Sequence, residues 1–280
     1  MKLRLPKLFL LAIIIGVIFV SGLGVIYLPG FIEKQSLKPP PPYKKLSEEE
    51  SRPSTESGKI KYPHDYTFVI LGDSMTETLG NTDELRGYLN EYYPDKTFEV
   101  LNYGYGATSI ISAKERLTQT TYHAGRDFDP ILDINFDYLI VESFGHNPLS
   151  EYKEQGLQKQ TEILDDLVEL IATTSGKEKL IFLGTIGTNK DTYAKTTADL
   201  DAKTRKEWAL ERDSYIKNHL EYAKSHNIPA IDAFTPSLDL FGNTKQFLVR
   251  TDDYLHPSPT GVLFIQKKIA EFLAKNQFVK

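Results

Sequence analysis

Short hydrophobic runs recur along the chain after His64, and stretches with helical patterning separate them. Five runs of apolar or β-branched residues have the length of β-strands: Tyr66–Gly72, Thr97–Asn102, Asp137–Phe144, Lys179–Ile186 and Ile228–Ala233. Helices are predicted over Asp83–Tyr93, Glu154–Thr174 and Leu200–His226, and an amphipathic helix follows Gly261. Strands that alternate with helices predict an α/β domain over residues 65–280, with a five-stranded parallel sheet covered by helices on both faces.

The first 28 residues have a different pattern. A short basic tail, residues 1–7, precedes the stretch Leu8–Leu28, which contains no charged residue. As a helix this stretch would be about 31 Å long, at roughly 1.5 Å per residue, which matches the core of a bilayer. Only Val20-Ser21-Gly22 resembles a signal-peptide cleavage site, and apolar residues continue past it. The pattern therefore favours an uncleaved transmembrane signal anchor.

Residues 29–64 have the composition of a semi-rigid linker. Four consecutive prolines, Pro39–Pro42, are followed by lysines and by the acidic run Glu48–Glu50. Lysines follow the apolar stretch as well as precede it, so the positive-inside rule does not fix the orientation alone. We expect the short basic tail to stay in the cytoplasm. This orientation makes the protein a single-pass protein of the cell membrane with its folded domain outside the cytoplasm.

Composition excludes several classes of protein. The 280 residues are 40% hydrophobic and 25% charged, which suits a globular domain and excludes disorder throughout. The chain has no cysteine, so it has no thiol nucleophile, disulfide scaffold or cysteine zinc site. A net charge of -5 gives no basic surface for nucleic acid. None of these properties sets the oligomeric state.

Residues that can carry out chemistry follow several of the predicted strands, at the sheet edge where α/β proteins bind ligands. In chain order these motifs are Gly72-Asp73-Ser74, Asn102-x-Gly104-x-Gly106, Gly145-His146-Asn147 and Asp253-x-x-His256. Taken singly, each is more often a turn than a functional motif. Their joint occurrence in this order favours a site for acyl transfer.

The motifs supply the groups that acyl transfer needs. A serine hydroxyl becomes a nucleophile when a base removes its proton. Of the six histidines, only His256 has an acidic residue three positions before it. We therefore expect Asp253 to orient His256, and His256 to activate Ser74. Glycine N–H groups, an asparagine amide and the N–H of Ser74 are suitable donors for the developing oxyanion.

The motifs resemble those of the SGNH hydrolases, also called the GDSL esterase/lipase family, over nearly all of residues 65–280. The resemblance implies a three-layer α/β/α, flavodoxin-like fold and the cleavage of acyl esters without a metal or other cofactor. It also assigns roles, with Ser74, Asp253 and His256 as the catalytic triad and with Ser74, Gly106 and Asn147 as the oxyanion hole. Where the family usually has aspartate after this asparagine, Pro148 stands, which predicts a different rim of the site.

Three further residues have two interpretations each. His146 is a candidate for contact with the substrate, or a partly exposed loop histidine. Glu142 lies within an apolar strand, where it could pair near the site, but we expect it to face solvent at the strand end. Trp208, with nearby arginines, could line a sugar-binding rim, but its spacing favours an ordinary half-buried helix face.

Other enzyme classes lack their motifs. The chain has no Gly-Lys-Ser/Thr phosphate loop and no His-Glu-x-x-His zinc motif, and Thr76 stands where an α/β-hydrolase elbow needs glycine. The preferred function is a serine esterase that acts on a small-molecule or glycan acyl ester. The absence of a long apolar lid sequence favours a short acyl group. Two alternatives stay open, an O-acyltransferase that acts on envelope glycans with the same residues and a catalytically idle binding module.

Overall fold

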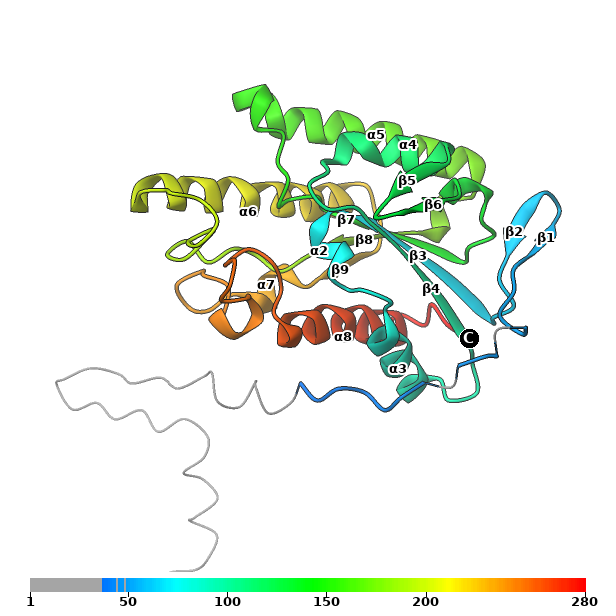
Figure 1. Cartoon of the computed structure of the whole chain (residues 1–280). Helices are drawn as coiled ribbons and strands as arrows, with labels where there is room; N and C mark the ends of the chain where they lie inside the picture. Colours follow the sequence, from blue (N-terminus) through cyan, green and yellow to red (C-terminus); the bar gives the residue numbers. More distant parts are fainter. Residues whose placement is uncertain (1–36, 44, 48) are drawn as a thin grey trace, which may run out of the picture. The chain divides into compact units, whose positions relative to one another are not determined.

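A five-stranded parallel sheet forms the centre of the structure, a computed structural model shown in Figure 1. The strands lie in the order β4-β3-β7-β8-β9. They span Tyr66–Gly72 (β3), Phe98–Gly104 (β4), Tyr138–Glu142 (β7), Leu180–Gly184 (β8) and Ala230–Asp232 (β9). The first of these strands along the chain lies between the second and the third, which is the flavodoxin-like order. A ligand crevice is expected where this order reverses, at the carboxyl ends of β3 and β7.

Helices form a layer on each face of the sheet (Figure 1). On one face, α3 (Asp83–Tyr92) packs against α8 (Pro259–Lys275). On the other face, α5 (Gly156–Thr174) packs against α6 (Ala202–Ser225), with α4 (Ala113–Thr118) beside them. The three-layer α/β prediction is confirmed, and each predicted strand and long helix is found with its ends within about two residues.

The strands read as continuous apolar runs because both faces of the sheet are buried. In β3, Val69 and Leu71 belong to the core cluster that also contains Leu164 of α5. Phe68 and Ile70 are equally inaccessible, and alternation along a strand turns them toward the opposite helix layer. A core on both faces holds the carboxyl end of β3 in place, and the chain continues from there into the candidate nucleophile.

Local capping fixes the segments on either side of the site. Ser258 accepts a hydrogen bond from the N–H of Gly261 at 3.0 Å, and Pro259 occupies the first position of α8. Ser258 comes two residues after His256, so the capped start of α8 fixes the position of the loop that carries this candidate base. The short helix α2 (Ser74–Glu77) begins directly after β3, and Asp73 caps it.

The structure describes residues 37–43, 45–47 and 49–280, and groups Pro39–Lys280 in one compact unit. The predicted anchor, residues 8–28, lies outside the described residues. Within the described ranges, no helix has the length and apolar character needed to cross a membrane. The segment expected to be a linker contains an antiparallel hairpin, β1 (Ser54–Glu56) and β2 (Lys59–Lys61). Three more short elements are β5 (Thr121–His123), β6 (Arg126–Phe128) and α7 (Phe234–Ser237).

Candidate active site

Five of the six site residues predicted from sequence line one cavity of about 350 Å³. These are Ser74, Gly106, His146, Asn147 and His256. They come from the segments that follow β3, β4 and β7 and from the loop before α8. The sixth, Asp253, is hydrogen-bonded to His256. The fold therefore brings together residues that are up to about 180 positions apart in the sequence, at the sheet edge where the strand order reverses.

Asp253 and His256 form a hydrogen-bonded pair. The Oδ2 atom of Asp253 lies 2.8 Å from Nδ1 of His256. The other carboxylate oxygen accepts the backbone N–H groups of Leu255, at 2.8 Å, and of His256, at 3.1 Å. Partial burial acts to raise the pKa of Asp253, but these backbone bonds and the His256 side chain outweigh it and leave the pKa below its ordinary value. An ionised Asp253 keeps the proton of a neutral His256 on Nδ1, so that Nε2 is free to act as a base.

Ser74 is the first residue of α2, where the N–H groups have no acceptor within the helix. The side chain of Asp73 caps this helix by accepting the N–H of Met75 at 2.8 Å. Ser74 and His256 line the same cavity, although in the described part of the chain no hydrogen bond joins their side chains. Such contacts commonly become shorter when a substrate binds.

An acidic side chain lies beside each of two predicted oxyanion donors, Asn147 and Gly106. Asn147 Nδ2 donates to Oδ2 of Asp73 at 2.9 Å, which fixes the orientation of the amide and leaves its second N–H for a ligand. At Gly106, an added Cβ would lie 2.5 Å from Oε2 of Glu77, so only glycine fits there without displacing that carboxylate. The geometry is compatible with the predicted oxyanion hole of Ser74, Gly106 and Asn147.

Glu142 is a buried acid beneath this site, so the expectation that it faces solvent is wrong. Its side chain is 1% exposed. One carboxyl oxygen lies 3.4 Å from the N–H of Asp73, and the other accepts the hydroxyl of Ser143 at 2.5 Å. Burial and the neighbouring charge of Asp73 raise the pKa of Glu142 well above its ordinary value. Other segments of the chain bury the end of β7, and the sequence of this strand alone does not indicate that burial.

A buried arginine ties together the ends of β3 and β4. One guanidinium nitrogen of Arg116 donates to the carbonyl of Gly72 at 2.7 Å and to that of Tyr103 at 2.8 Å. Burial lowers its pKa to about 10, so the side chain stays charged at neutral pH. Its positive charge also lies near Asp73 and Glu142 and partly compensates the two acids.

His146 lies at the wall of the cavity and is held by the backbone. Its Nε2 atom is 3.1 Å from the carbonyl oxygen of Ile186, so the Nε2–H tautomer is favoured. Burial lowers the pKa of His146 and outweighs the nearby charge of Asp73. A neutral His146 presents Nδ1 as a hydrogen-bond acceptor rather than a charge.

Several backbone positions around the cavity are in the left-handed region although they are not glycine. They are Ala107 (φ 57°), Phe144 (φ 53°), Ala194 (φ 53°) and Tyr254 (φ 55°). Such conformations cost of order 1–3 kcal/mol each and concentrate at functional sites. Ala107 follows Gly106, Phe144 precedes Gly145, and Tyr254 lies between Asp253 and His256. Ala107 and Tyr254 therefore turn the chain directly beside candidate site residues.

Sequence reasoning missed four residues that line the cavity, Glu77, Ala107, Tyr193 and Leu255. Glu77 lies three residues after Ser74, one turn along α2, and its carboxylate is 2.7 Å from Nε2 of His123. That spacing is a signal that could have identified it. Tyr193 lies in the loop after β8, and no motif in the sequence of this loop indicates a site.

Within the described ranges, no three histidine or acidic side chains gather closely enough to hold a metal ion. No protein-family model and no curated protein matches the chain. Solved structures do resemble it. A lipase/acylhydrolase from Enterococcus faecalis is 18% identical, with a TM-score of 0.55 over 75% of this chain and 96% of that chain. An acetylxylan esterase from Geobacillus stearothermophilus is 14% identical, with a TM-score of 0.54 over 77% of this chain and 97% of that chain.

A GDSL-like lipase from Bacteroides thetaiotaomicron is 12% identical, with a TM-score of 0.52 over 75% of this chain and 89% of that chain. These likenesses span nearly the whole of each solved chain but leave about a quarter of this one unmatched. At such identities they show that the chain shares the three-layer fold of these proteins.

Proposed function

We propose that this chain is an SGNH-type serine esterase that hydrolyses short acyl esters, including O-acetyl groups on glycans. The observation that carries the proposal is the Asp253–His256 pair, joined at 2.8 Å, in contact with the cavity that Ser74 also lines. The resemblance of the solved lipases and of the acetylxylan esterase supports the same chemistry.

The reaction follows from the roles of these groups. His256 Nε2 takes the proton of the Ser74 hydroxyl as Oγ attacks the acyl carbon, and the carbonyl oxygen becomes an oxyanion. Hydrogen bonds from Ser74, Gly106 and Asn147 stabilise that charge. His256 then gives the proton to the departing alkoxide, which leaves an acyl ester on Ser74. Water attacks this ester with His256 again as base, releases the acid and restores Ser74.

The cavity favours a small acyl group. A volume of about 350 Å³ lies at the small end of ligand sites, and part of it must hold the alcohol side of the ester. One of the similar structures is named as an acetylxylan esterase, in keeping with a short acyl group on a sugar. We place the domain at the outer surface of the cell membrane, held by the apolar stretch Leu8–Leu28.

The test uses the full-length chain and the variant Ser74→Ala. Both are treated with a fluorophosphonate probe and with p-nitrophenyl acetate, and labelled peptides are identified. Labelling of Ser74 together with loss of turnover in the variant would support the esterase. A folded wild-type chain that neither labels nor turns over would contradict it. A parallel reaction with added sugar distinguishes hydrolysis from transfer, because a transferase forms the acylated sugar at the expense of free acid.

A further inference from the structure

The described residues of a proline-rich segment, 39–43 and 45–46, lie beside helix α3, on a part of the molecule outside the candidate active site. We call this segment the strap. Its partly buried residues are Pro40, Tyr43 and Leu46, and the described residues between them are exposed. A polyproline II helix has three residues per turn, so residues at this spacing share one face. Prolines fix φ near the polyproline II value, so the strap loses little entropy when it docks.

The surface beneath the strap is formed by Asp83, Arg86 and Gly87 of α3, and we call it the dock. A Cβ added at Gly87 would lie 2.7 Å from the Pro40 ring and 2.8 Å from the Pro41 carbonyl oxygen. Glycine inside a helix costs about 0.5–1 kcal/mol relative to alanine. The close approach of the strap gives this glycine a structural reason.

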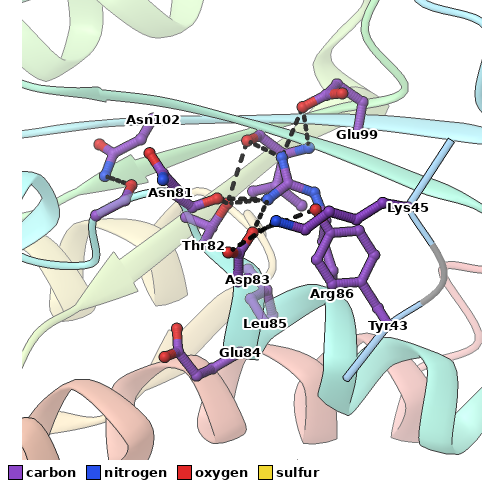
Figure 2. A network of polar contacts seen from close by, with 12 residues as sticks. Tyr43, Lys45, Asn81, Thr82, Asp83, Glu84, Leu85, Arg86, Glu99 and Asn102 are labelled. Atoms are coloured by element: carbon purple, nitrogen blue, oxygen red, sulfur yellow. Dashed lines mark hydrogen bonds and ion pairs between the residues drawn. The ribbon is translucent and has the colours of Figure 1, made fainter. Parts of the chain in front are cut away.

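Polar contacts fix the second half of the strap (Figure 2). The Tyr43 hydroxyl donates to Asp83 Oδ1 at 3.2 Å, and Lys45 Nζ lies 3.4 Å from Asp83 Oδ2. The guanidinium of Arg86 lies over the Tyr43 ring, with its carbon 5.4 Å from the ring centre. A cation that lies over an aromatic ring is a favourable contact, and here the strap supplies the ring and the dock supplies the cation.

The dock is held in place by the domain itself. Arg86 is 8% exposed and donates to Glu99 Oε1 at 2.7 Å, to the Val100 carbonyl at 3.0 Å and to the Thr82 hydroxyl at 3.1 Å. Its guanidinium is therefore positioned by contacts that do not involve the strap, so the surface that receives Tyr43 is preorganised.

We propose that the dock is a binding site for a polyproline II segment, which this chain occupies with its own strap. Without this docking, the tether would extend to the hairpin β1–β2, whose Ile60 pairs with Ile134 of the domain. Docking leaves residues 29–38 as the tether instead of residues 29–53. Ten residues reach at most about 36 Å, against about 90 Å for 25 residues, at roughly 3.6 Å per residue. The shorter tether would keep the candidate active site close to the membrane. This consequence rests on the proposed anchor.

A double-mutant cycle on the full-length chain tests the docking. Its variants are Gly87→Ala, a strap of equal length in which Pro39–Pro42 becomes Gly-Ser-Gly-Ser, and the combination of both. With the altered strap, Gly87→Ala should raise the midpoint of thermal unfolding by about 1–4 °C, because alanine is the better helix former. With the native strap it should lower the midpoint or leave it unchanged, because the new Cβ meets Pro40. An equal rise in both backgrounds would overturn the proposal.

A distance measurement provides a second readout, and the absence of cysteine makes it clean. Spin labels at Pro42→Cys and Glu91→Cys should give one narrow distance distribution, which Tyr43→Ala broadens. Tyr122→Ala, at a tyrosine that is 72% exposed on β5, is the matched control and should leave it narrow. A distribution that is already broad before Tyr43 is changed would contradict the docking. Fluorophosphonate labelling of Ser74 in the same samples reports on the proposed esterase separately.

Discussion

Two acids at the candidate active site, Asp253 and Glu142, differ in what surrounds them. The Asp253 side chain is 18% exposed, and backbone N–H groups with His256 lower its pKa. Glu142 is almost fully buried, and burial with the charge of Asp73 raises its pKa. The comparison teaches that hydrogen-bond donors and burial decide which acid is charged. The surroundings of Asp253, which is hydrogen-bonded to His256, favour its charged form, and those of Glu142, beside Asp73, favour its neutral form.

The largest expected effect comes from removing the charge of the first acid. In Asp253→Asn, the new amide can donate to His256 Nδ1 and so favours the wrong tautomer of the base. We expect kcat/KM for p-nitrophenyl acetate to fall by about 10²–10⁴, with little change in folding. Asp166→Asn, at an exposed acid on α5, is the matched control. A variant that keeps most of its activity would exclude Asp253 from the triad.

A second prediction concerns a third acid, Asp73, which contacts Glu142 and accepts the amide of Asn147. Asn147→Ala removes a proposed oxyanion donor and should lower kcat by about 10²–10³. Asp73→Asn keeps the oxygen that caps α2 but replaces the one that accepts the Asn147 amide, so we expect about a tenfold loss. If Asp73 acts through Asn147, its substitution should cost almost nothing further in Asn147→Ala. Equal losses in both backgrounds would show that Asp73 acts by another route.

Much of this site could be predicted from the sequence, because parallel strands end at one edge and each motif follows its strand directly. Ser74, Gly106 and Asn147 are placed by β3, β4 and β7, so their convergence needs only the order of the strands. His256 is predicted from its spacing of three residues to Asp253. The strands are predictable because both faces of the sheet are buried and require apolar runs. The helices are predictable because their buried faces require apolar residues at helical spacing.

The rest depends on contacts between distant segments. Glu142 contacts Asp73, 69 positions away, and the sequence of β7 alone does not indicate that contact. Tyr193 reaches the cavity from a loop with no motif. The strap looked like a spacer because prolines suit both a free linker and a docked polyproline II segment. The contact of Gly87 with the strap distinguishes a docked segment from a free linker. Gly87 lies in α3, so the sequence of the strap itself does not indicate this contact.

A third prediction tests the neutral state of Glu142 through stability. Its folded-state pKa is raised, so below its unfolded value both states are protonated and its contribution is fully present. As the pH rises toward the folded-state pKa, the unfolded chain releases its proton first, and the free energy of unfolding falls by up to about 1.4 kcal/mol per pH unit. Glu142→Gln should remove this slope in urea titrations between pH 5 and 8. Parallel slopes for the wild type and the variant would mean that Glu142 is ionised in the fold.

The smallest expected effect is the opposite pH dependence of Asp253. Its folded-state pKa is lowered, so its contribution to stability is present above the unfolded value and is lost as the pH falls through the folded value. The difference in urea midpoint between the wild type and Asp253→Asn should therefore become smaller below about pH 4. The difference in urea midpoint between the wild type and Glu142→Gln should be constant in that pH range. Because Asp253 is partly exposed, solvent screening keeps this change small. If both differences narrowed over the same pH range, the two acids would share one environment, and the contrast between them would not hold.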